Sequence, residues 1–312
     1  MQYAHLFGPV RSRRLGSSLG VDLVPFKTCN CNCIYCECGG APSVSHRRAE
    51  YIPASELISE LEQYLNSIPP IDVVTFAGSG EPTLNTALGP VIRFVKNRFP
   101  GFKTALLTNG TLFHLREVRD EVLTVDLVLP SLDAVSPEVF HRVNRPCRGL
   151  DVRKLIDGLI AFSSEYKGDL RVEIFIVPGV NDTPAELVLF KDVLLKIRPT
   201  RVQLNSLDRP GPCEWVTTAT VESLQMIAEY FRPLPVEIIS RNASCVMPPL
   251  SHPENLDGTI RRQLQRRPAT LEEIAVLCSA AINEIQPVLN DLTARHFLET
   301  DKVNGRLYYR VT

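Results

Sequence analysis

The chain has 312 residues, of which 44% are hydrophobic and 22% charged, and its formal net charge at pH 7 is −1. This composition excludes wholesale disorder, and the length suggests one large domain or two unequal ones. A net charge near zero argues against a protein that coats nucleic acid. The sequence has no apolar run long enough for a transmembrane helix and no secretory signal, so we expect a cytoplasmic protein.

Apolar runs alternate with amphipathic stretches over most of the chain. The amphipathic stretches predict helices, one of which has Ser55 as its predicted N-cap. The apolar runs predict strands at residues 21–24, 71–76, 102–108, 125–129, 170–177, 201–205 and 236–240. About six β–α units of this kind predict an α/β fold with parallel strands, either barrel-like or doubly wound. Residues at the carboxyl ends of the strands should then converge on one face.

The pattern changes near residue 250, where several prolines interrupt it. Beyond them we expect helices at about 255–266, 270–278 and 283–296, with Thr270 and Glu273 in a capping box. Asn304-Gly305 predicts a two-residue hairpin turn. Three short helices and a hairpin are typical of a winged helix-turn-helix, so the predicted domains are residues 1–248 and 252–312.

Five of the nine cysteines lie within ten residues: Cys29, Cys31, Cys33, Cys36 and Cys38. Such a dense, odd-numbered set of thiols fits a disulfide framework poorly in a cytosolic chain and favours metal binding. Cys29, Cys33 and Cys36 have the spacing C-x3-C-x2-C. Three thiolates on a 4Fe–4S cluster leave one iron free to bind a small chelating ligand. A structural zinc site is the alternative. Cys31 and Cys38 are expected to be bystanders near the cluster, and a redox or alternative ligand role stays open.

The segment from Thr28 to Cys36, with Tyr35 before its last cysteine, resembles the signature of the radical S-adenosylmethionine (SAM) superfamily. The resemblance continues at four predicted strand ends, namely Phe76–Leu84, Thr108–Gly110, Ser131–Asp133 and Val177–Asp182. Residues 8–16 and Asn144-Arg145-Pro146 resemble a branch of iron–sulfur oxidoreductases related to the wyosine-forming tRNA enzymes. The resemblance implies a partial (β/α)6 TIM-like barrel followed by the small winged helix-turn-helix domain.

The resemblance also implies a chemistry. Cys29, Cys33 and Cys36 would hold the 4Fe–4S cluster, whose open iron chelates SAM. One electron, from a donor such as flavodoxin or ferredoxin, would cleave SAM to methionine and a 5′-deoxyadenosyl radical that abstracts hydrogen from the substrate. The implied SAM contacts are Gly78, Ser79, Gly80 and Glu81 at the methionine end, Asn109, Ser131 and Asp133 toward the ribose or carboxylate, and Tyr35 and Asn181 near the adenine. Glu81 and Asp133 could alternatively be solvated loop carboxylates.

Four further cysteines are scattered along the chain. Cys147, Cys213 and Cys245 each follow a predicted strand, so a barrel would place them on one face, and our hypothesis is a second iron–sulfur cluster there with an open iron for substrate. Isolated buried thiols are the default interpretation against which this hypothesis stands. Cys278 lies in the apolar pattern of a helix and is expected in a core.

The substrate is left open between a peptide or protein, a tRNA nucleoside and a small anionic metabolite, which Arg11, Arg13 and Arg14 could clamp if they are not simply a solvated basic stretch. No histidine has a recognisable catalytic spacing, so the catalytic residues and the reaction subclass are unassigned.

Residues 252–312 contain eight Lys or Arg and eight Asp or Glu, so the C-terminal domain is neutral. Its presumed recognition helix carries Glu284, Asp291 and only Arg295 as a cation, which favours docking of a peptide or protein, or purely structural packing, over nucleic-acid binding. The competing function is an iron–sulfur transcription regulator that senses redox state and binds DNA through the winged helix. A sensor has no need of SAM-pocket motifs, which argues against it.

Overall fold

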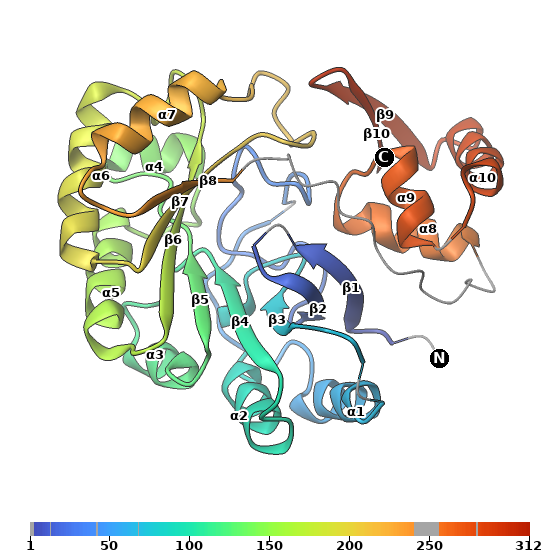
Figure 1. The fold of residues 1–312 in the computed structure, drawn as a ribbon, viewed down its shortest axis with the longest axis horizontal. Helices are drawn as coiled ribbons and strands as arrows, with labels where there is room; N and C mark the ends of the chain where they lie inside the picture. The colour runs from blue at the N-terminus through green and yellow to red at the C-terminus, as the bar shows by residue number, and fades with distance from the viewer. Residues whose placement is uncertain (1–2, 13, 42, 68, 240–255, 279) are drawn as a thin grey trace.

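The structure, a computed structural model, describes residues 3–12, 14–41, 43–67, 69–239, 256–278 and 280–312. Its larger part is a single eight-stranded sheet in the order β1 to β8 (Figure 1). Strand β1 pairs antiparallel with β2, and all later neighbours pair in parallel. The strands are β1 (Leu6–Ser12), β2 (Gly16–Asp22), β3 (Val73–Ala77), β4 (Lys103–Thr108), β5 (Leu127–Pro130), β6 (Asp169–Ile176), β7 (Arg201–Ser206) and β8 (Val236–Ile238).

Helices connect the parallel strands and cover one side of the curved sheet, as Figure 1 shows. They are α1 (Ala54–Leu65), α2 (Leu88–Arg98), α3 (Arg116–Val122), α4 (Pro137–Val143), α5 (Val152–Glu165), α6 (Pro184–Ile197) and α7 (Val221–Tyr230), with a short 3-10 turn η1 (Pro82–Leu84). Seven parallel strands with six helical connections confirm the predicted alternation of strands and helices.

Two local predictions need correction. Strand β1 was not expected, because Gly8 and Pro9 normally break a strand; here the pairing register with β2 shifts between Phe7 and Val10, which accommodates them at the sheet edge. Ser55 is not the N-cap of α1. That helix begins at Ala54, whose N–H donates to the Glu50 carboxylate at 2.9 Å, so an acidic side chain outside the helix satisfies its first donor.

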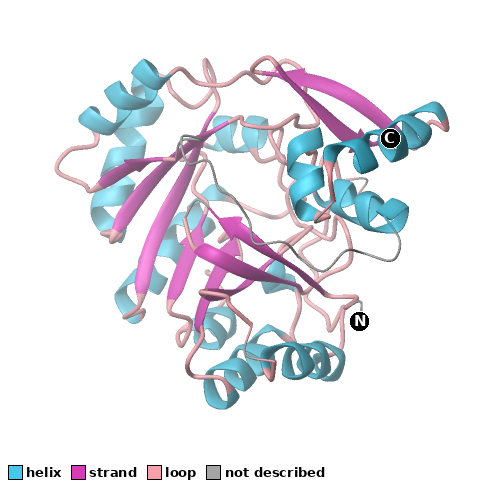
Figure 2. Cartoon of the chain, turned by 45° about the vertical axis from the view of Figure 1, so that its right-hand side comes forward, coloured by secondary structure: helices cyan, strands magenta, loops and turns pink. Residues whose placement is uncertain are grey.

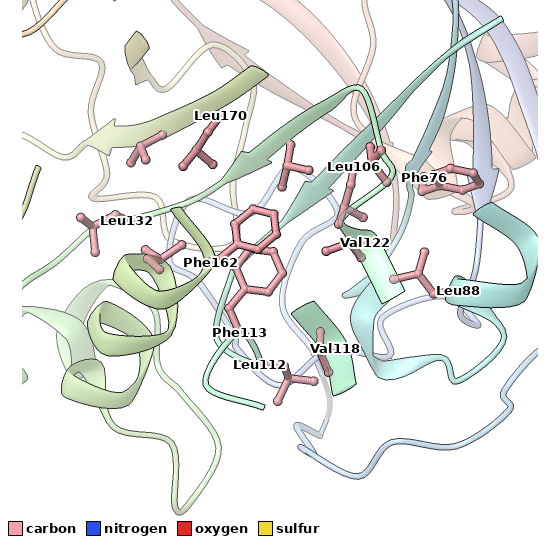
Figure 3. Packing of buried hydrophobic residues seen from close by; sticks show 14 of the residues in the cluster. Phe76, Leu88, Leu106, Leu112, Phe113, Val118, Val122, Leu132, Phe162 and Leu170 are labelled. Carbon is pink, nitrogen blue, oxygen red and sulfur yellow. The ribbon is translucent and has the colours of Figure 1, made fainter. Parts of the chain in front are cut away.

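The main apolar core lies between the sheet and the helices that cover it. Phe76, Leu106, Ile174 and Leu204 contribute to this core from β3, β4, β6 and β7. Figure 3 shows part of it, including Phe113 and Phe162, which come from different segments and stack with ring centroids 4.5 Å apart. Because side chains alternate across a strand, the residues between them face the other, concave side of the sheet.

Residues 256–312, which we call the C-terminal unit, form three helices and a two-stranded antiparallel hairpin around a separate core. Thr270 and Glu273 form the predicted capping box, and Asn304 and Gly305 have the positive φ angles, 51° and 75°, that the hairpin turn requires. Cys278 is buried in this core, as expected. The elements are α8 (Leu256–Arg266), α9 (Leu271–Leu277), α10 (Ile282–Ala294), β9 (Leu298–Val303) and β10 (Arg306–Val311).

The expected boundary at residues 248–252 lies outside the described residues. Within the ranges that the structure describes, no helix has both the length and the apolar character needed to cross a membrane.

Candidate functional site

The clustered cysteines lie in the loop that follows β2, across the carboxyl ends of the parallel strands. Backbone hydrogen bonds fix this loop at several points. Glu81 N donates to Thr28 O at 3.0 Å, and Ile34 N donates to Val143 O at 2.9 Å. Gly80 lies so close to Thr28 that a Cβ atom there would be 2.1 Å from its carbonyl oxygen. The cysteine loop is therefore held between the ends of β3 and α4.

Two asparagine amides lie beside sulfur atoms of the C-x3-C-x2-C spacing. Asn109 Nδ2 is 3.9 Å from Cys29 Sγ, and Asn144 Nδ2 is 3.4 Å from Cys33 Sγ. Burial raises the pKa of the Cys29 thiol, with further contributions from nearby negative groups. An N–H group that faces a buried sulfur stabilises negative charge on it, so these amides favour thiolates at this position.

Cys36, the last cysteine of the spacing, is also supported by its neighbours. A hydrogen bond from the Cys38 thiol opposes the effect of burial and, with the Lys27 ammonium, lowers the pKa of Cys36 to about 7. The same arrangement raises the pKa of Cys38, and a hydrogen bond to Cys33 raises the pKa of Cys31. Both extra cysteines thus lie beside cysteines of the spacing, and the Cys31 N–H also faces Cys29 Sγ at 3.5 Å.

The chemistry of this group fits an iron–sulfur cluster with a polar ligand beside it. Lys27 Nζ and Asn144 Oδ1 are buried and have no hydrogen-bond partner among the described residues. In the same part of the chain, no three Cys, His, Asp or Glu side chains are arranged to hold a single metal ion. A cluster spreads its ligands over separate iron atoms, so its thiolates need not converge on one point. Half-buried thiols, a buried cation and an unpaired amide oxygen provide suitable groups for both the cluster and its ligand.

Glu81 is only 2% exposed and is not a solvated carboxylate. Its Oε1 accepts hydrogen bonds from Thr83 N at 3.0 Å, Thr83 Oγ1 at 2.6 Å and Thr108 Oγ1 at 2.6 Å, and its Oε2 accepts one from Asn109 N at 2.7 Å. Burial raises the pKa of Glu81, and these hydrogen bonds oppose that shift. The side chain ties the turn after β3 to the end of β4.

The glycine-rich turn packs directly on the end of β2. Ser79 N donates to Asp22 Oδ1 at 3.0 Å, and Ser79 O accepts from Lys27 N at 2.8 Å. Gly78 has φ 133°, and a Cβ atom on it would lie 1.8 Å from Asp22 Oδ1. Only glycine allows the backbone to adopt this conformation so close to a carboxylate.

Asp133, 3% exposed at the end of β5, joins three segments of the site. Its Oδ1 accepts from Phe175 N at 2.9 Å, and its Oδ2 accepts from the Tyr35 hydroxyl and from Asn144 Nδ2 at 2.9 Å. Burial raises the pKa of Asp133, and these donors oppose the shift. The Tyr35 ring stacks on Phe175 with centroids 3.8 Å apart. Asp133 therefore connects these segments by hydrogen bonds inside the protein and is not a solvated loop residue.

Asn181 and Ser131 lie at the neighbouring strand ends. Asn181 is fully buried, accepts from Val177 N at 2.8 Å and donates to Phe175 O at 2.7 Å and Asp133 O at 2.9 Å. Ser131 is half-buried and its backbone N–H donates to Thr108 O at 2.9 Å. Asn181 thus fixes the turn after β6, while Ser131 leaves part of its surface exposed.

The three remaining candidate cluster cysteines have separate surroundings. Cys147 Sγ lies 3.6 Å from His46 Nδ1, and Cys213 packs against the apolar group that contains Ile34 and Val216. Cys245 lies outside the described residues. Whether the three share a cluster therefore stays a prediction.

The basic segment at residues 11–14 is described only in part. Arg14 pairs with Glu173 on β6, and both side chains are largely buried, so Arg14 is not simply solvated. Arg13 and the side chain of Arg11 lie outside the described residues.

Three residues at the site were not predicted from the sequence. Lys27 precedes Cys29 by two positions, and Asn144 belongs to the Asn-Arg-Pro segment that was noted only for its resemblance. Asp22 lies within a predicted strand, and nothing in the sequence marks it as part of a site. Their roles depend on contacts with Cys33, Cys36 or Ser79 that only the folded chain creates.

The chain is similar to known proteins in sequence and in fold. The profile of the Radical SAM superfamily matches residues 23–190. A UPF0026 protein of Helicobacter pylori (strain J99) is 37% identical over 288 residues, covering 91% of this chain and 92% of the relative. A UPF0026 protein of Methanocaldococcus jannaschii is 31% identical over 238 residues, covering 76% and 72%.

Another relative, from Brachyspira hyodysenteriae, carries the name GTPase Obg. It is 33% identical over 311 residues, which cover 98% of this chain but 45% of the relative, so the chain spans less than half of that protein. The sequence contains no G-x-x-x-x-G-K-[ST] motif. The name therefore gives no reason to assign GTP hydrolysis to this chain.

Several solved structures share the fold. A radical SAM methyltransferase from Sphaerobacter thermophilus matches with a TM-score of 0.53 and 18% identity, over 71% of this chain and 66% of that one. TYW1 with a lysine-pyruvate adduct bound gives 0.51 and 17%, over 69% and 72%. Native anSMEcpe with bound AdoMet gives 0.50 and 17%, over 78% and 66%.

Members of the superfamily are enzymes that use a 4Fe–4S cluster and SAM, which decides against both the zinc site and the regulator without SAM chemistry. From the profile match and the long UPF0026 alignments, we conclude that the chain is an enzyme of the radical SAM superfamily and belongs, within it, with the UPF0026 proteins.

Proposed function

We propose that this enzyme holds its 4Fe–4S cluster on Cys29, Cys33 and Cys36 and abstracts hydrogen from a peptide or protein substrate. The cluster, when bound and reduced, supplies the electron that splits SAM into methionine and a 5′-deoxyadenosyl radical. The observation that carries the ligand assignment is the position of these three half-buried thiols beside two amide donors and an ammonium group, in the segment covered by the superfamily profile.

In this proposal, residues at different strand ends bind different parts of SAM. The backbone of Gly78, Ser79 and Gly80 is suited to the methionine end, because glycine lets a ligand approach the main chain. The unpaired Asn144 Oδ1 and the half-exposed Ser131 offer polar contacts nearby. The Tyr35 ring, stacked on Phe175, gives a flat surface for the adenine.

Glu81, Asp133 and Asn181 then act as positioning residues. Each is nearly or fully buried and binds backbone groups of neighbouring strand ends. In this assignment they hold Asn109, Tyr35 and the turn after β6 at fixed places around the ligand, and they exclude water from the site.

We further propose that the C-terminal unit is a winged helix-turn-helix that docks the substrate. The order of three helices and a hairpin supports this assignment. The hairpin is turned toward the core, since Tyr308 Oη donates to Asp208 O at 3.0 Å and Asn304 Nδ2 to Thr218 Oγ1 at 3.1 Å. A wing engaged in this way is poorly placed to enter a nucleic-acid groove. This favours a peptide or protein over a tRNA nucleoside.

An electron donor completes the proposal. A flavodoxin or ferredoxin supplies the electron. The wyosine-related branch stays a hypothesis, because the likeness to TYW1 at 17% identity supports the fold alone.

The second cluster, on Cys147, Cys213 and Cys245, can be tested separately. A chain in which Cys29, Cys33 and Cys36 are all replaced by alanine would retain iron and sulfide if that cluster exists. Loss of essentially all iron from that variant would contradict the proposed second cluster.

The proposed activity is tested by anaerobic reconstitution, followed by addition of dithionite and SAM. We expect 5′-deoxyadenosine, detected by mass spectrometry, that depends on the reductant and disappears in the Cys33→Ala variant. Reconstituted protein that binds iron but forms no 5′-deoxyadenosine, even after long incubation with reductant, would contradict the proposal. Mobility-shift assays with duplex DNA and tRNA should show no retention at physiological salt; retention would favour the nucleic-acid alternative.

A further inference from the structure

The C-terminal unit contacts the domain built on the eight-stranded sheet, which we call the core domain, beside the proposed cofactor site. Figures 1 and 2 both place it on the side of the sheet away from α3, α5 and α6, next to the β1–β2 edge. Two arginines form ion pairs across this junction, one from each side: Arg266 of the C-terminal unit and Arg209 of the core. One pair contacts the turn that we assign to SAM through Asp22, and the other contacts the cysteine loop that we assign to the cluster.

Arg266, the last residue of α8, binds the carboxylate that supports the glycine-rich turn. Its Nη2 and Nε lie 2.6 Å and 3.0 Å from Asp22 Oδ2, and its guanidinium group lies over the Phe7 ring at 4.7 Å. The other oxygen of Asp22 accepts the hydrogen bond from Ser79 N. The side chains of Arg266 and Asp22 are 20% and 11% exposed, so the pair is largely shielded from water.

The position of the Asp22 carboxylate determines where the turn can lie. Gly78 packs so closely against Oδ1 that no side chain would fit between them, and Ser79 N is bonded to the same oxygen. Because both oxygens of the carboxylate are engaged, a change at Oδ2 moves the acceptor at Oδ1 as well. A residue of the C-terminal unit thus holds the turn through one intermediate side chain.

Arg209 makes the corresponding link to the cysteine loop. It binds both oxygens of Glu273, at 2.5 Å and 2.8 Å, and the carbonyl of Pro268 at 2.8 Å. Its Nε lies 3.6 Å from the carboxylate of Glu37, which stands between Cys36 and Cys38. Burial opposes the charge of Arg209, yet the hydrogen bonds to Glu273 and the attraction of Glu37 raise its pKa. Bidentate pairs of this kind fix orientation as well as distance.

The backbone next to Arg209 also touches the cysteine loop. A Cβ atom on Gly211 would lie 3.2 Å from the Tyr35 backbone, so the two segments are in direct contact. The segment between β7 and α7 therefore lies between the C-terminal unit and the loop that carries Tyr35 and Glu37.

We propose that the C-terminal unit positions the SAM site, with Arg266 as a positioning residue that acts through Asp22 on the Gly78–Gly80 turn. The Glu273–Arg209 pair does the same for the cysteine loop. This inference rests on the proposed function, since it assigns that turn to SAM. The unit then contributes to cofactor binding whatever substrate it docks, because a turn held in its binding conformation loses less entropy when the ligand arrives.

The test uses the full-length, reconstituted chain with the Arg266→Ala substitution and measures the dissociation constant of SAM by equilibrium dialysis. We expect SAM binding to weaken on the order of tenfold, as for a modest misplacement of a binding group, with iron content unchanged. Arg295→Ala is the matched control: Arg295 lies in the same unit and pairs with Asp291 at 3.0 Å, but both side chains are more than half exposed. This control should leave SAM affinity unchanged.

Two further variants separate positioning from general stability. Arg266→Lys keeps the charge and should recover part of the lost affinity. Asp22→Asn keeps an oxygen for Ser79 N, removes the charge that Arg266 binds, and should weaken SAM binding even if the alanine variant does not fold. Unchanged affinity in Arg266→Ala or Asp22→Asn, with wild-type protein that binds SAM, would overturn this inference alone. Wild-type protein with an intact cluster but no affinity for SAM would instead contradict the proposed function.

Discussion

Polar groups are buried in different ways at two places in the core domain: the face proposed to bind the cofactors, and the junction with the C-terminal unit. At the cofactor face, Glu81 and Asp133 are each surrounded by neutral donors from backbone, hydroxyl and amide groups. At the junction, Asp22 and Glu273 each face an arginine that is 244 and 64 residues away in the chain, respectively. The site is thus held by hydrogen bonds from neutral donors, whereas its attachment to the C-terminal unit depends on charge and hence on pH.

The largest effect is expected at the cysteine loop itself. Cys36→Ala should abolish nearly all iron incorporation on anaerobic reconstitution, since a cluster with two protein ligands is poorly held. Cys38→Ala, which alters the contact to Cys36 but is not an assigned ligand, should keep most of the iron. Iron and sulfide quantitation decides the matter. Equal losses in the two variants would mean that the ligand set is assigned wrongly.

Glu81→Ala tests the hydrogen-bonded side of the comparison. Removing this carboxylate leaves buried donors on Thr83, Thr108 and Asn109 without their acceptor, so the free energy of unfolding should fall by roughly 3 kcal/mol. The exposed Glu62 of α1 provides a control that should change it very little. Urea unfolding of the apoprotein measures both. A Glu81 variant as stable as the Glu62 variant would show that the carboxylate does not hold the turn.

Glu273→Gln tests the charge-dependent attachment of the C-terminal unit. Glutamine suits the capping box at this position, so the substitution mainly removes the charge that pairs with Arg209. Burial tends to raise the pKa of Glu273, but the Arg209 hydrogen bonds outweigh it and lower that pKa below its usual 4.5. A lowered pKa means that the carboxylate stabilises the fold above about pH 4.5 and that this contribution is lost as the pH falls through the lowered value.

The variant should therefore be less stable than wild type by roughly 2 kcal/mol near pH 7, and the two should converge in acid. Thermal or urea unfolding across pH 3 to 7 checks the trend. A difference that stays constant over this range would show that the pair contributes through packing and not through charge.

The smallest effect concerns Asn144. Its N–H group faces Cys33 Sγ, and such donors stabilise the more negative, reduced state of a cluster. Asn144→Ala should lower the midpoint potential on the order of tens of millivolts, as measured by redox titration with EPR detection. Asn290→Ala, an exposed position on α10, is the control. An unchanged or raised potential would exclude this role for the amide.

The sequence was sufficient for those parts of the molecule that depend on local pattern. The strand and helix alternation follows from apolar runs, and the Thr270–Glu273 capping box and the Asn304-Gly305 turn follow from residues next to each other in the chain. The cysteine spacing likewise predicted the loop on which the site is built. Strand β1 escaped prediction because its Gly8-Pro9 pair is typical of a loop, and only the edge position makes it a strand.

The surroundings of the site could not be predicted in the same way. Glu81 and Asp133 looked equally suited to solvent or ligand, and only the fold shows that both are buried and bonded to backbone. Asp22 and Arg266 lie near opposite ends of the chain, and no periodicity relates them. Contacts of this range arise from the packing of whole elements, which the sequence pattern does not encode residue by residue.

The EPR spectrum of the dithionite-reduced, reconstituted protein, recorded with and without SAM, tests the central claim most directly. If a cluster on Cys29, Cys33 and Cys36 has an iron that binds SAM, then adding SAM should change the g values of the signal. A reduced-cluster signal that SAM leaves unaltered, or a preparation that holds zinc in place of iron at this loop, would contradict the account.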